Sequence, residues 1–197
     1  AILMNSMSGY DSKDTTSLKS DVPNFLENIN QSIKGKKIGI IKEFDLSDLD
    51  IEVQKRFEES KHAYESLGAE FTEVSLPNIS ASVPTYYSIA PAECSSNLSR
   101  FDGVRFGYRA ENTDGLNDLY IKSRSEGFGD EVKRRILIGT YALSAGYYDA
   151  YYKKAQQVRR LIKNDFDQVF KSVDLLMTPT SPSTAVKFES KGTQNPG

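Results

Sequence analysis

Between residues 35 and 76, strand and helix patterns alternate, and this alternation limits the possible folds more than any other feature. Residues 35–41 are a short apolar, β-branched run bounded by glycine and turn-forming residues, which predicts a buried strand. Over residues 50–67 apolar side chains recur every three or four positions, and Gly68 stands where a helix C-cap belongs. Residues 70–76 predict a second strand. Two strands joined by a helical crossover are expected to be parallel, with a right-handed connection.

Helical periodicity dominates the rest of the chain. Helices are predicted at residues 84–98, 116–123 and 130–145. From Tyr148 to Val169 one helical face stays apolar for about six turns. Residues 174–178 predict a buried strand that joins the first two. The predicted fold class is α/β, mainly helical with a few short strands: a strand-helix-strand unit, several helices and a final strand.

The two ends of the chain differ in composition from its middle. Residues 5–24 are rich in Ser, Asp, Lys and Thr, so residues 1–24 are predicted to be an exposed linker that continues from a missing core. Residues 25–185 are expected to form the α/β unit, and residues 186–197 a polar truncated tail. Since no initiator methionine is present, we interpret the sequence as a piece of a longer protein.

Composition and charge argue against several classes of function. With 38% hydrophobic and 26% charged residues, the chain has the composition of a globular protein. Its net charge of -2 argues against a surface that binds nucleic acid by charge alone. The single cysteine, Cys94, cannot form an internal disulfide, which favours a reducing compartment and hence the cytoplasm. No apolar run is long enough to predict a membrane span.

Residues for catalysis by the chain itself are not evident. The only histidine, His62, lies on the polar side of the first predicted helix, so a Ser-His-Asp arrangement has no base. The sequence has no Gly-x-Ser-x-Gly elbow, no Walker loop and no Gly-x-Gly-x-x-Gly. Without a histidine beside it, Cys94 is interpreted as a small packed residue. Neither a catalytic residue nor a metal site is predicted.

A basic group lies off the apolar stripe of the last predicted helix. It consists of Lys153, Lys154, Arg159, Arg160 and Lys163. A charged helix face usually only meets water. A patch that faces RNA is the alternative interpretation.

Three ordered stretches carry a resemblance to a known family. They are residues 95–108 (SSNLSRFDGVRFGY), residues 123–136, with SRSEGFG and EVKRRI, and residues 146–153 (GYYDAYYK). Together they resemble the A subunit of glutamyl-tRNA(Gln) amidotransferase, of the amidase signature superfamily. The similarity runs from about Ile2 to Ala185 and implies a fragment of an amidase-signature-type α/β fold.

The resemblance also implies a function for the longer parent protein. In that family the A subunit hydrolyses glutamine with a Ser-cis-Ser-Lys triad, and the ammonia passes to the B subunit, which amidates Glu or Asp mischarged on tRNA. The B and C subunits are the expected partners, and ATP and Mg are used by the partner subunit. This sequence contains no Gly-Gly-Ser-Ser-Gly-Gly stretch, so the triad is expected upstream of Ala1 and the chain alone is expected to be inactive.

Two substrate contacts of the family fall on matching positions. Tyr86 is the first tyrosine of the Pro-x-Tyr-Tyr segment, and Arg135 is the second arginine of Glu-Val-Lys-Arg-Arg. By resemblance, Arg135 would grip the α-carboxylate of glutamine with its planar fork, and Tyr86 would hydrogen-bond the ligand. A further acidic contact of the family lies beyond the end of this chain. Without the resemblance, a salt-bridged surface arginine and a packed tyrosine are the simpler interpretations.

Two alternatives to the amidotransferase interpretation remain open. One is a free-standing binding module that uses the basic group toward RNA. The other is a fragment of a different amidase-superfamily hydrolase, acting on fatty amides, aryl amides or malonamide. The segments SRSEGFG and KRR favour the tRNA-dependent branch, while the choice between Glu-tRNA and Asp-tRNA stays open. Because only three short strands are predicted, an exposed sheet edge prone to self-association is also expected.

Overall fold

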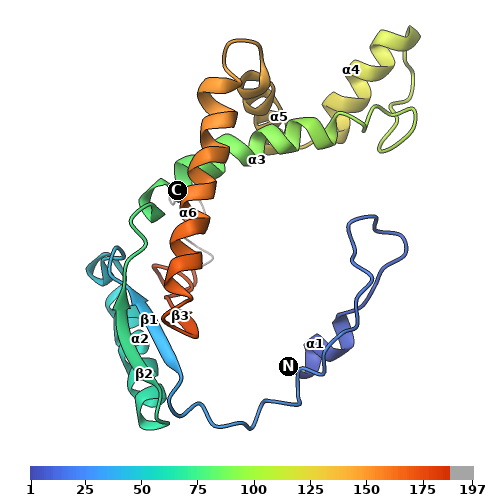
Figure 1. Cartoon of the computed structure of the whole chain (residues 1–197). Helices are drawn as coiled ribbons and strands as arrows, with labels where there is room; N and C mark the ends of the chain where they lie inside the picture. Colours follow the sequence, from blue (N-terminus) through green and yellow to red (C-terminus); the bar gives the residue numbers. More distant parts are fainter. Residues whose placement is uncertain (187–197) are drawn as a thin grey trace.

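The three predicted strands form one parallel sheet in the computed structural model, which describes residues 1–186 (Figure 1). The central strand β1 (Lys37–Ile41) pairs with β2 (Glu70–Val74) on one side and with β3 (Leu175–Met177) on the other. Helix α2 (Ile51–Ser66) connects β1 to β2. The predicted α/β class and the parallel pairing are therefore confirmed.

A glycine in the middle of β1 lets the side chains of both neighbouring strands meet over the sheet. Gly39 is buried, and a Cβ built on it would lie 2.8 Å from Leu176 Cδ2 and 3.0 Å from Val74 Cγ2. Ile38 and Ile41, on either side, are 5% and 4% exposed. The apolar run predicted as a strand is thus buried because it is the centre of the sheet.

The core of the α/β part lies where helix α6 (Lys154–Val169) approaches the sheet. Its buried members are Ile41, Val74, Leu76, Val169 and Val173. Leu76 is only 1% exposed and is the largest fully buried side chain of the described chain. Asp165 of α6 ties the same region together, because its carboxylate accepts hydrogen bonds from the backbone and side-chain amides of Asn78 at 2.9 to 3.1 Å.

The apolar stripe predicted for the first helix is only partly buried. Phe57 is 6% exposed, as expected, and Gly68 ends α2 with a φ of +89°. Tyr64 and Leu67, on the same stripe, are 43% and 63% exposed. The last turn of the helix is therefore less covered than its middle.

Helices α3 (Ser82–Leu98) and α5 (Asp130–Leu143) confirm two of the predicted helices and cross at close range. A Cβ built on Gly139 of α5 would lie 1.9 Å from the carbonyl oxygen of Pro91 in α3. The crossing therefore requires a residue without a side chain at this position. Near it, the hydroxyl groups of Ser95 and Thr140 are hydrogen-bonded across the two helices at 2.8 Å.

The last helix does not begin as predicted. The prediction of one α-helical stripe from Tyr148 is wrong in its first turns, because η3 (Asp149–Lys153) is a π-helix that continues into α6. The backbone N–H of Lys153 donates to the carbonyl of Tyr148 at 3.0 Å, five residues back. The Tyr152 hydroxyl, in this wider π-helical turn, donates to Glu93 of α3 at 2.6 Å. This hydrogen bond joins η3 to the neighbouring helix.

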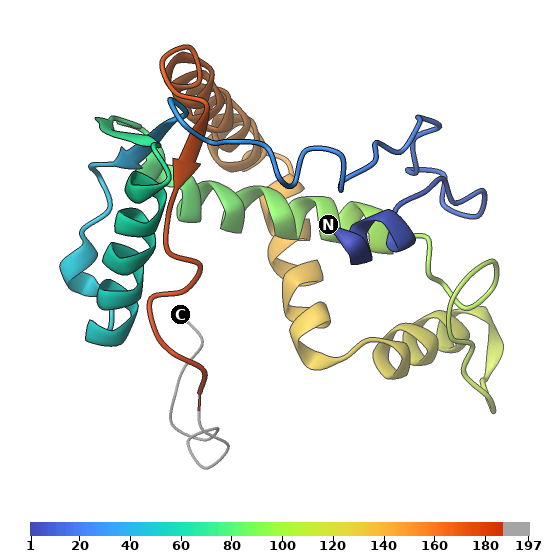
Figure 2. The ribbon, with the colours of Figure 1, turned by 90° about the horizontal axis from the view of Figure 1, so that it is seen from below.

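Helix α4 (Gly115–Gly127) and the loop before it extend beyond the far end of α3 (Figures 1 and 2). Arg124 holds this arm to α3 by donating from Nη1 to the carbonyls of Leu98 and Phe101 at 3.0 and 2.9 Å. The hydroxyl of Ser123, only 3% exposed, accepts from the backbone N–H of Ala110 at 3.0 Å. The predicted helix at residues 116–123 is confirmed and is somewhat longer than expected.

The N-terminal segment stands away from the sheet (Figure 1). It holds a short helix, α1 (Ile2–Met7), that its composition did not predict, and residues 8–36 form no helix or strand. Residues 18–32 are all exposed. The domain boundaries at residues 24 and 185 stay predictions, and the polar tail predicted at residues 186–197 lies, except for Val186, outside the described residues.

Candidate functional site

The two residues predicted to bind substrate lie side by side. Tyr86 is on α3 and Arg135 is on α5, 49 positions further along the chain. The Nη1 atom of Arg135 donates a hydrogen bond to the Tyr86 hydroxyl oxygen at 3.0 Å. The close α3–α5 crossing brings the two together, because both lie on the faces that the helices turn toward each other.

A third side chain, Glu131, completes this cluster from one turn earlier on α5. Its Oε1 accepts a hydrogen bond from Nε of Arg135 at 3.0 Å, and its Oε2 accepts one from Arg134. Glu131 begins the EVKRRI segment but was not predicted as a site residue. The spacing of four residues between an acidic and a basic residue on a helix was the available indication.

Both charges of the cluster are favoured by their neighbours. The hydrogen bond to Tyr86, and then the one to Glu131, raises the pKa of Arg135 above its usual value. The hydrogen bond from Arg135 lowers the pKa of the Glu131 carboxyl. At neutral pH the site therefore holds a guanidinium fixed on two sides by a carboxylate and a phenol.

The cluster is accessible from solvent. Tyr86 is 49% exposed and the Arg135 side chain 36% exposed. Guanidinium N–H groups and a phenolic O–H can donate to an anion, and a carboxylate of a small molecule is the anion whose geometry suits the planar fork. Neither side chain is a nucleophile at neutral pH, so the cluster can bind and orient a ligand.

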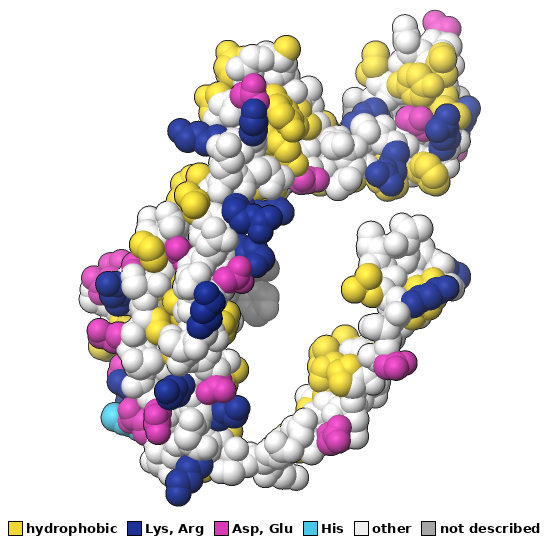
Figure 3. Space-filling model, in the orientation of Figure 1, with side chains coloured by type: hydrophobic (Ala, Val, Ile, Leu, Met, Phe, Trp, Pro, Cys, Tyr) yellow, Lys and Arg dark blue, Asp and Glu magenta, His cyan; other side chains and the backbone are white. Residues whose placement is uncertain are grey.

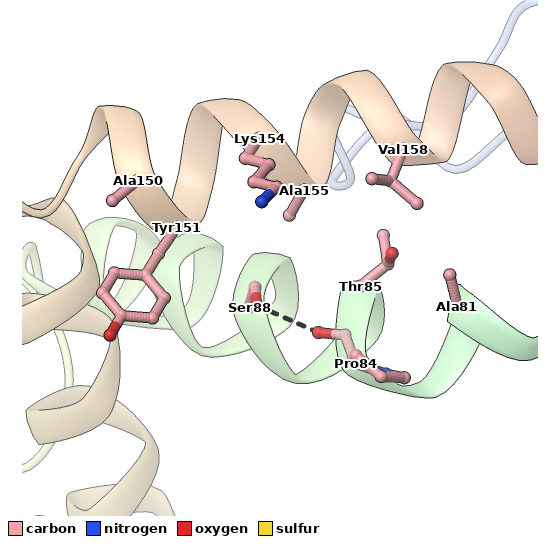
Figure 4. A pocket seen from close by; sticks show the side chains of 9 residues that line it. All are labelled: Ala81, Pro84, Thr85, Ser88, Ala150, Tyr151, Lys154, Ala155 and Val158. Carbon is pink, nitrogen blue, oxygen red and sulfur yellow. Dashed lines mark hydrogen bonds between the residues drawn. The ribbon is translucent and has the colours of Figure 1, made fainter.

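A separate pocket of about 230 Å³ lies between α3 and the start of α6 (Figure 4). Ala81, Pro84, Thr85 and Ser88 line it on one side, and Ala150, Tyr151, Lys154, Ala155 and Val158 on the other. The Ser88 hydroxyl already donates to the Pro84 carbonyl at 2.9 Å. Neither Tyr86 nor Arg135 lines this pocket, so the predicted site is a surface cluster beside it.

His62 and Cys94, for which no catalytic role is predicted, have surroundings that fit that prediction. The His62 side chain is 71% exposed and bonded to Glu65, and Cys94 is half-buried in α3. Among residues 1–186 no group of three or more His, Cys, Asp or Glu is placed to hold a metal ion. No helix in the described range is long and apolar enough to cross a membrane.

The basic group on η3 and α6 is partly neutralised. Lys153 pairs with Asp149, and Lys163 pairs with Asp167. Figure 3 shows Lys and Arg side chains interspersed with acidic ones over this part of the molecule. An interspersed pattern of this kind is typical of a solvated helix face.

Comparisons with known proteins agree with the resemblance seen in the sequence. The chain is 58% identical over 185 residues to the A subunit of the glutamyl-tRNA(Gln) amidotransferase of Ruthia magnifica, covering 94% of this chain and 38% of that protein. It is 57% identical over 192 residues to the corresponding protein of Cellvibrio japonicus, covering 98% and 40%. The chain thus spans about two fifths of the length of the curated relatives it matches.

Solved structures and a family model also match the chain. The crystal structure of the glutamyl-tRNA(Gln) amidotransferase A subunit from Thermotoga maritima matches with a TM-score of 0.66 and 39% identity, over 100% of this chain and 37% of that one. A bacterial aryl acylamidase of the amidase signature family shares the fold, with a TM-score of 0.59 and 21% identity. The model of the family described as "Amidase" matches residues 1–196. The chain therefore belongs to the amidase family.

Proposed function

We propose that the chain is part of the A subunit of a glutamyl-tRNA(Gln) amidotransferase, and that Tyr86 and Arg135 bind the α-carboxylate of glutamine there. The observation that carries the site is the hydrogen bond between them, which joins two residues from different helices into one group of donors. The identity of 58% to a curated A subunit supports the choice of this branch over other amidases.

The proposed role of the complete A subunit is to release ammonia from glutamine. The ammonia converts Glu-tRNA(Gln) to Gln-tRNA(Gln), or Asp-tRNA(Asn) to Asn-tRNA(Asn), on the B subunit of a cytoplasmic complex that also contains the C subunit. By the resemblance to this family, we assign ATP and Mg to the partner subunit. We assign no catalytic residue to the chain itself and expect it to be inactive alone.

The two side chains divide the binding task by their chemistry. Arg135 supplies a permanent positive charge and N–H groups in a fixed plane, which suit a carboxylate. The Tyr86 oxygen already accepts from Arg135, so its own O–H is free to donate to the ligand. A glutamine carboxylate that accepts from both groups would be held by the positive charge of Arg135 and oriented by the two hydrogen bonds.

The test is glutamine hydrolysis, measured as released ammonia, by the full-length protein in complex with its partners. With Arg135→Ala, the loss of charged hydrogen bonds should raise KM by about 10- to 100-fold. Arg159→Ala serves as the matched control, since Arg159 is an exposed arginine of α6 far along the chain from the cluster. This chain by itself should release no ammonia.

Two results would contradict the proposal in different ways. Ammonia release by this chain alone would mean that it holds a nucleophile that the sequence does not reveal. An unchanged KM in Arg135→Ala would remove the site while leaving the family assignment intact.

A further inference from the structure

Only some of the N–H groups of Arg135 have hydrogen-bond partners in the described structure. A guanidinium has five N–H groups, and in the described structure Nε is bonded to Glu131 and Nη1 to Tyr86. No hydrogen bond of Nη2 is found within residues 1–186. The part of the guanidinium available to a ligand is therefore the end formed by Nη1 and Nη2, next to the Tyr86 hydroxyl that Nη1 contacts.

Glu131 decides which edge is available. An arginine side chain has several rotatable bonds, and a half-exposed one would sample many orientations without a partner. The bond from Nε to Glu131 Oε1, 3.0 Å long, holds the Nε side of the guanidinium plane against α5. Tyr86 then lies at the end that faces α3.

We propose that Glu131 is a positioning residue, which holds the Arg135 guanidinium so that its Nη groups and the Tyr86 hydroxyl meet the α-carboxylate of glutamine together. This inference rests on the proposed function. In this proposal Glu131 does not bind the α-carboxylate itself, because two carboxylates repel each other. Its role is to reduce the conformational freedom that Arg135 would otherwise lose on binding.

An ion pair at this spacing could also serve α5 alone. Acidic and basic residues four positions apart stabilise many surface helices, and this pair would then have no effect on binding. The two explanations differ in which property of the Glu131 side chain a substitution must preserve. Helix stabilisation depends on the charge, whereas orientation of Arg135 depends on an oxygen placed to accept from Nε.

Three variants of the full-length complex separate these accounts through KM and kcat for glutamine. Glu131→Ala removes the acceptor, so KM should rise about tenfold while kcat stays within about twofold. Glu131→Gln keeps an oxygen for Nε, so KM should stay within about threefold of the wild type. Arg134→Gln removes the other ion pair of Glu131 and should leave KM unchanged. The Tm of each variant is measured alongside.

Each outcome decides the inference. A rise of KM in Glu131→Ala that is largely restored in Glu131→Gln supports it. If Arg135→Ala raises KM but Glu131→Ala does not, the positioning role is wrong and the proposed site stands. If Glu131→Ala lowers Tm and kcat together without a specific rise of KM, the pair serves only the helix and the inference is overturned. If Arg135→Ala itself is silent, the proposed site and the positioning role fall together.

Discussion

The α/β part and the α3–α5 pair of this protein are held together by opposite means. In the α/β part, large aliphatic side chains such as Leu76 and Val169 fill the space between the sheet and α6. In the α3–α5 pair, contact is made where side chains are missing or small, at Gly139 against the backbone of Pro91 and at Ala92, which is 1% exposed. The α/β part depends on large side chains that fill its core, whereas the α3–α5 pair depends on small residues that let the two helices approach closely.

This difference bears on function because the candidate site lies across the second kind of contact. Tyr86 and Arg135 meet only if α3 and α5 keep their separation. Larger apolar residues of α5, such as Leu137 at 72% exposure, lie outside the crossing. A change in the α/β core should thus lower stability first, whereas a change at the crossing should also disturb the site.

Loss of the largest buried side chain in the α/β part should have the strongest effect on stability. Leu76→Ala leaves a cavity among Ile41, Val74 and Val173, and is expected to lower the free energy of unfolding by about 4 kcal/mol, measured by urea denaturation. Leu161→Ala is the control, since Leu161 is 48% exposed, and should change it by less than about 0.5 kcal/mol. Equal costs for the two variants would show that the core is not where the structure puts it.

A methyl group at the α3–α5 crossing should come next. The Cβ of Gly139→Ala would lie 1.9 Å from the carbonyl oxygen of Pro91, so the helices must move apart at a cost of about 2 kcal/mol. Because the site spans this crossing, the KM for glutamine of the full-length complex should rise as well.

Gly9→Ala is the control for this substitution, because a Cβ at Gly9 meets nothing within 4 Å. The contrast between the two parts predicts that Leu76→Ala, at a temperature where the variant stays folded, leaves KM near the wild-type value. A rise of KM in Leu76→Ala as large as that in Gly139→Ala would show that the geometry of the site depends equally on the α/β core and on the α3–α5 crossing.

The smallest effect is expected from Asp174, whose pH-dependent hydrogen bonds join the start of β3 to the start of β1. The carboxylate of Asp174 accepts from the backbone N–H of Lys37 at 2.9 Å and from Lys36 Nζ at 3.0 Å, and these bonds, the first in particular, lower its pKa. A carboxyl whose pKa is lowered by folding adds stability that is complete above its unfolded value, about 3.9, and is lost as the pH falls through the folded pKa.

The measurement is the difference in unfolding free energy between wild type and Asp174→Asn as a function of pH. The wild type should be slightly more stable at pH 7, and the difference should shrink below about pH 4. If the Asp174→Asn difference does not change with pH, the hydrogen bonds between Asp174 and the start of β1 do not stabilise the fold.

Local patterns predicted most of the elements but not their irregularities. The strand at residues 35–41 and the helix ended by Gly68 follow from alternation, periodicity and a C-cap, all of which act within a few residues. The π-helix η3 could not be predicted from the apolar spacing, because Tyr151, Ala155 and Val158 recur every three or four positions as in an ordinary α-helix. The exposure of Leu67 could not be predicted either, since it depends on what covers α2.

The candidate site, too, could be predicted from the sequence only in part. Tyr86 and Arg135 could be named from motifs that the sequence shares with a family, and the spacing of Glu131 and Arg135 shows that the two can meet on one helix. Their substrate-binding role stays a prediction. The sequence did not indicate that Tyr86 would lie against Arg135, 49 residues away.

The types of the elements, the α/β class and the family follow from the sequence alone, because they depend on short-range patterns and ordered motifs. Which faces are covered and which distant residues meet follows only from the packing of the folded chain. Periodicity shows that a face is apolar but does not show which element packs against it. A single close approach, Gly139 against Pro91, sets the distance between two helices and with it the geometry of the site.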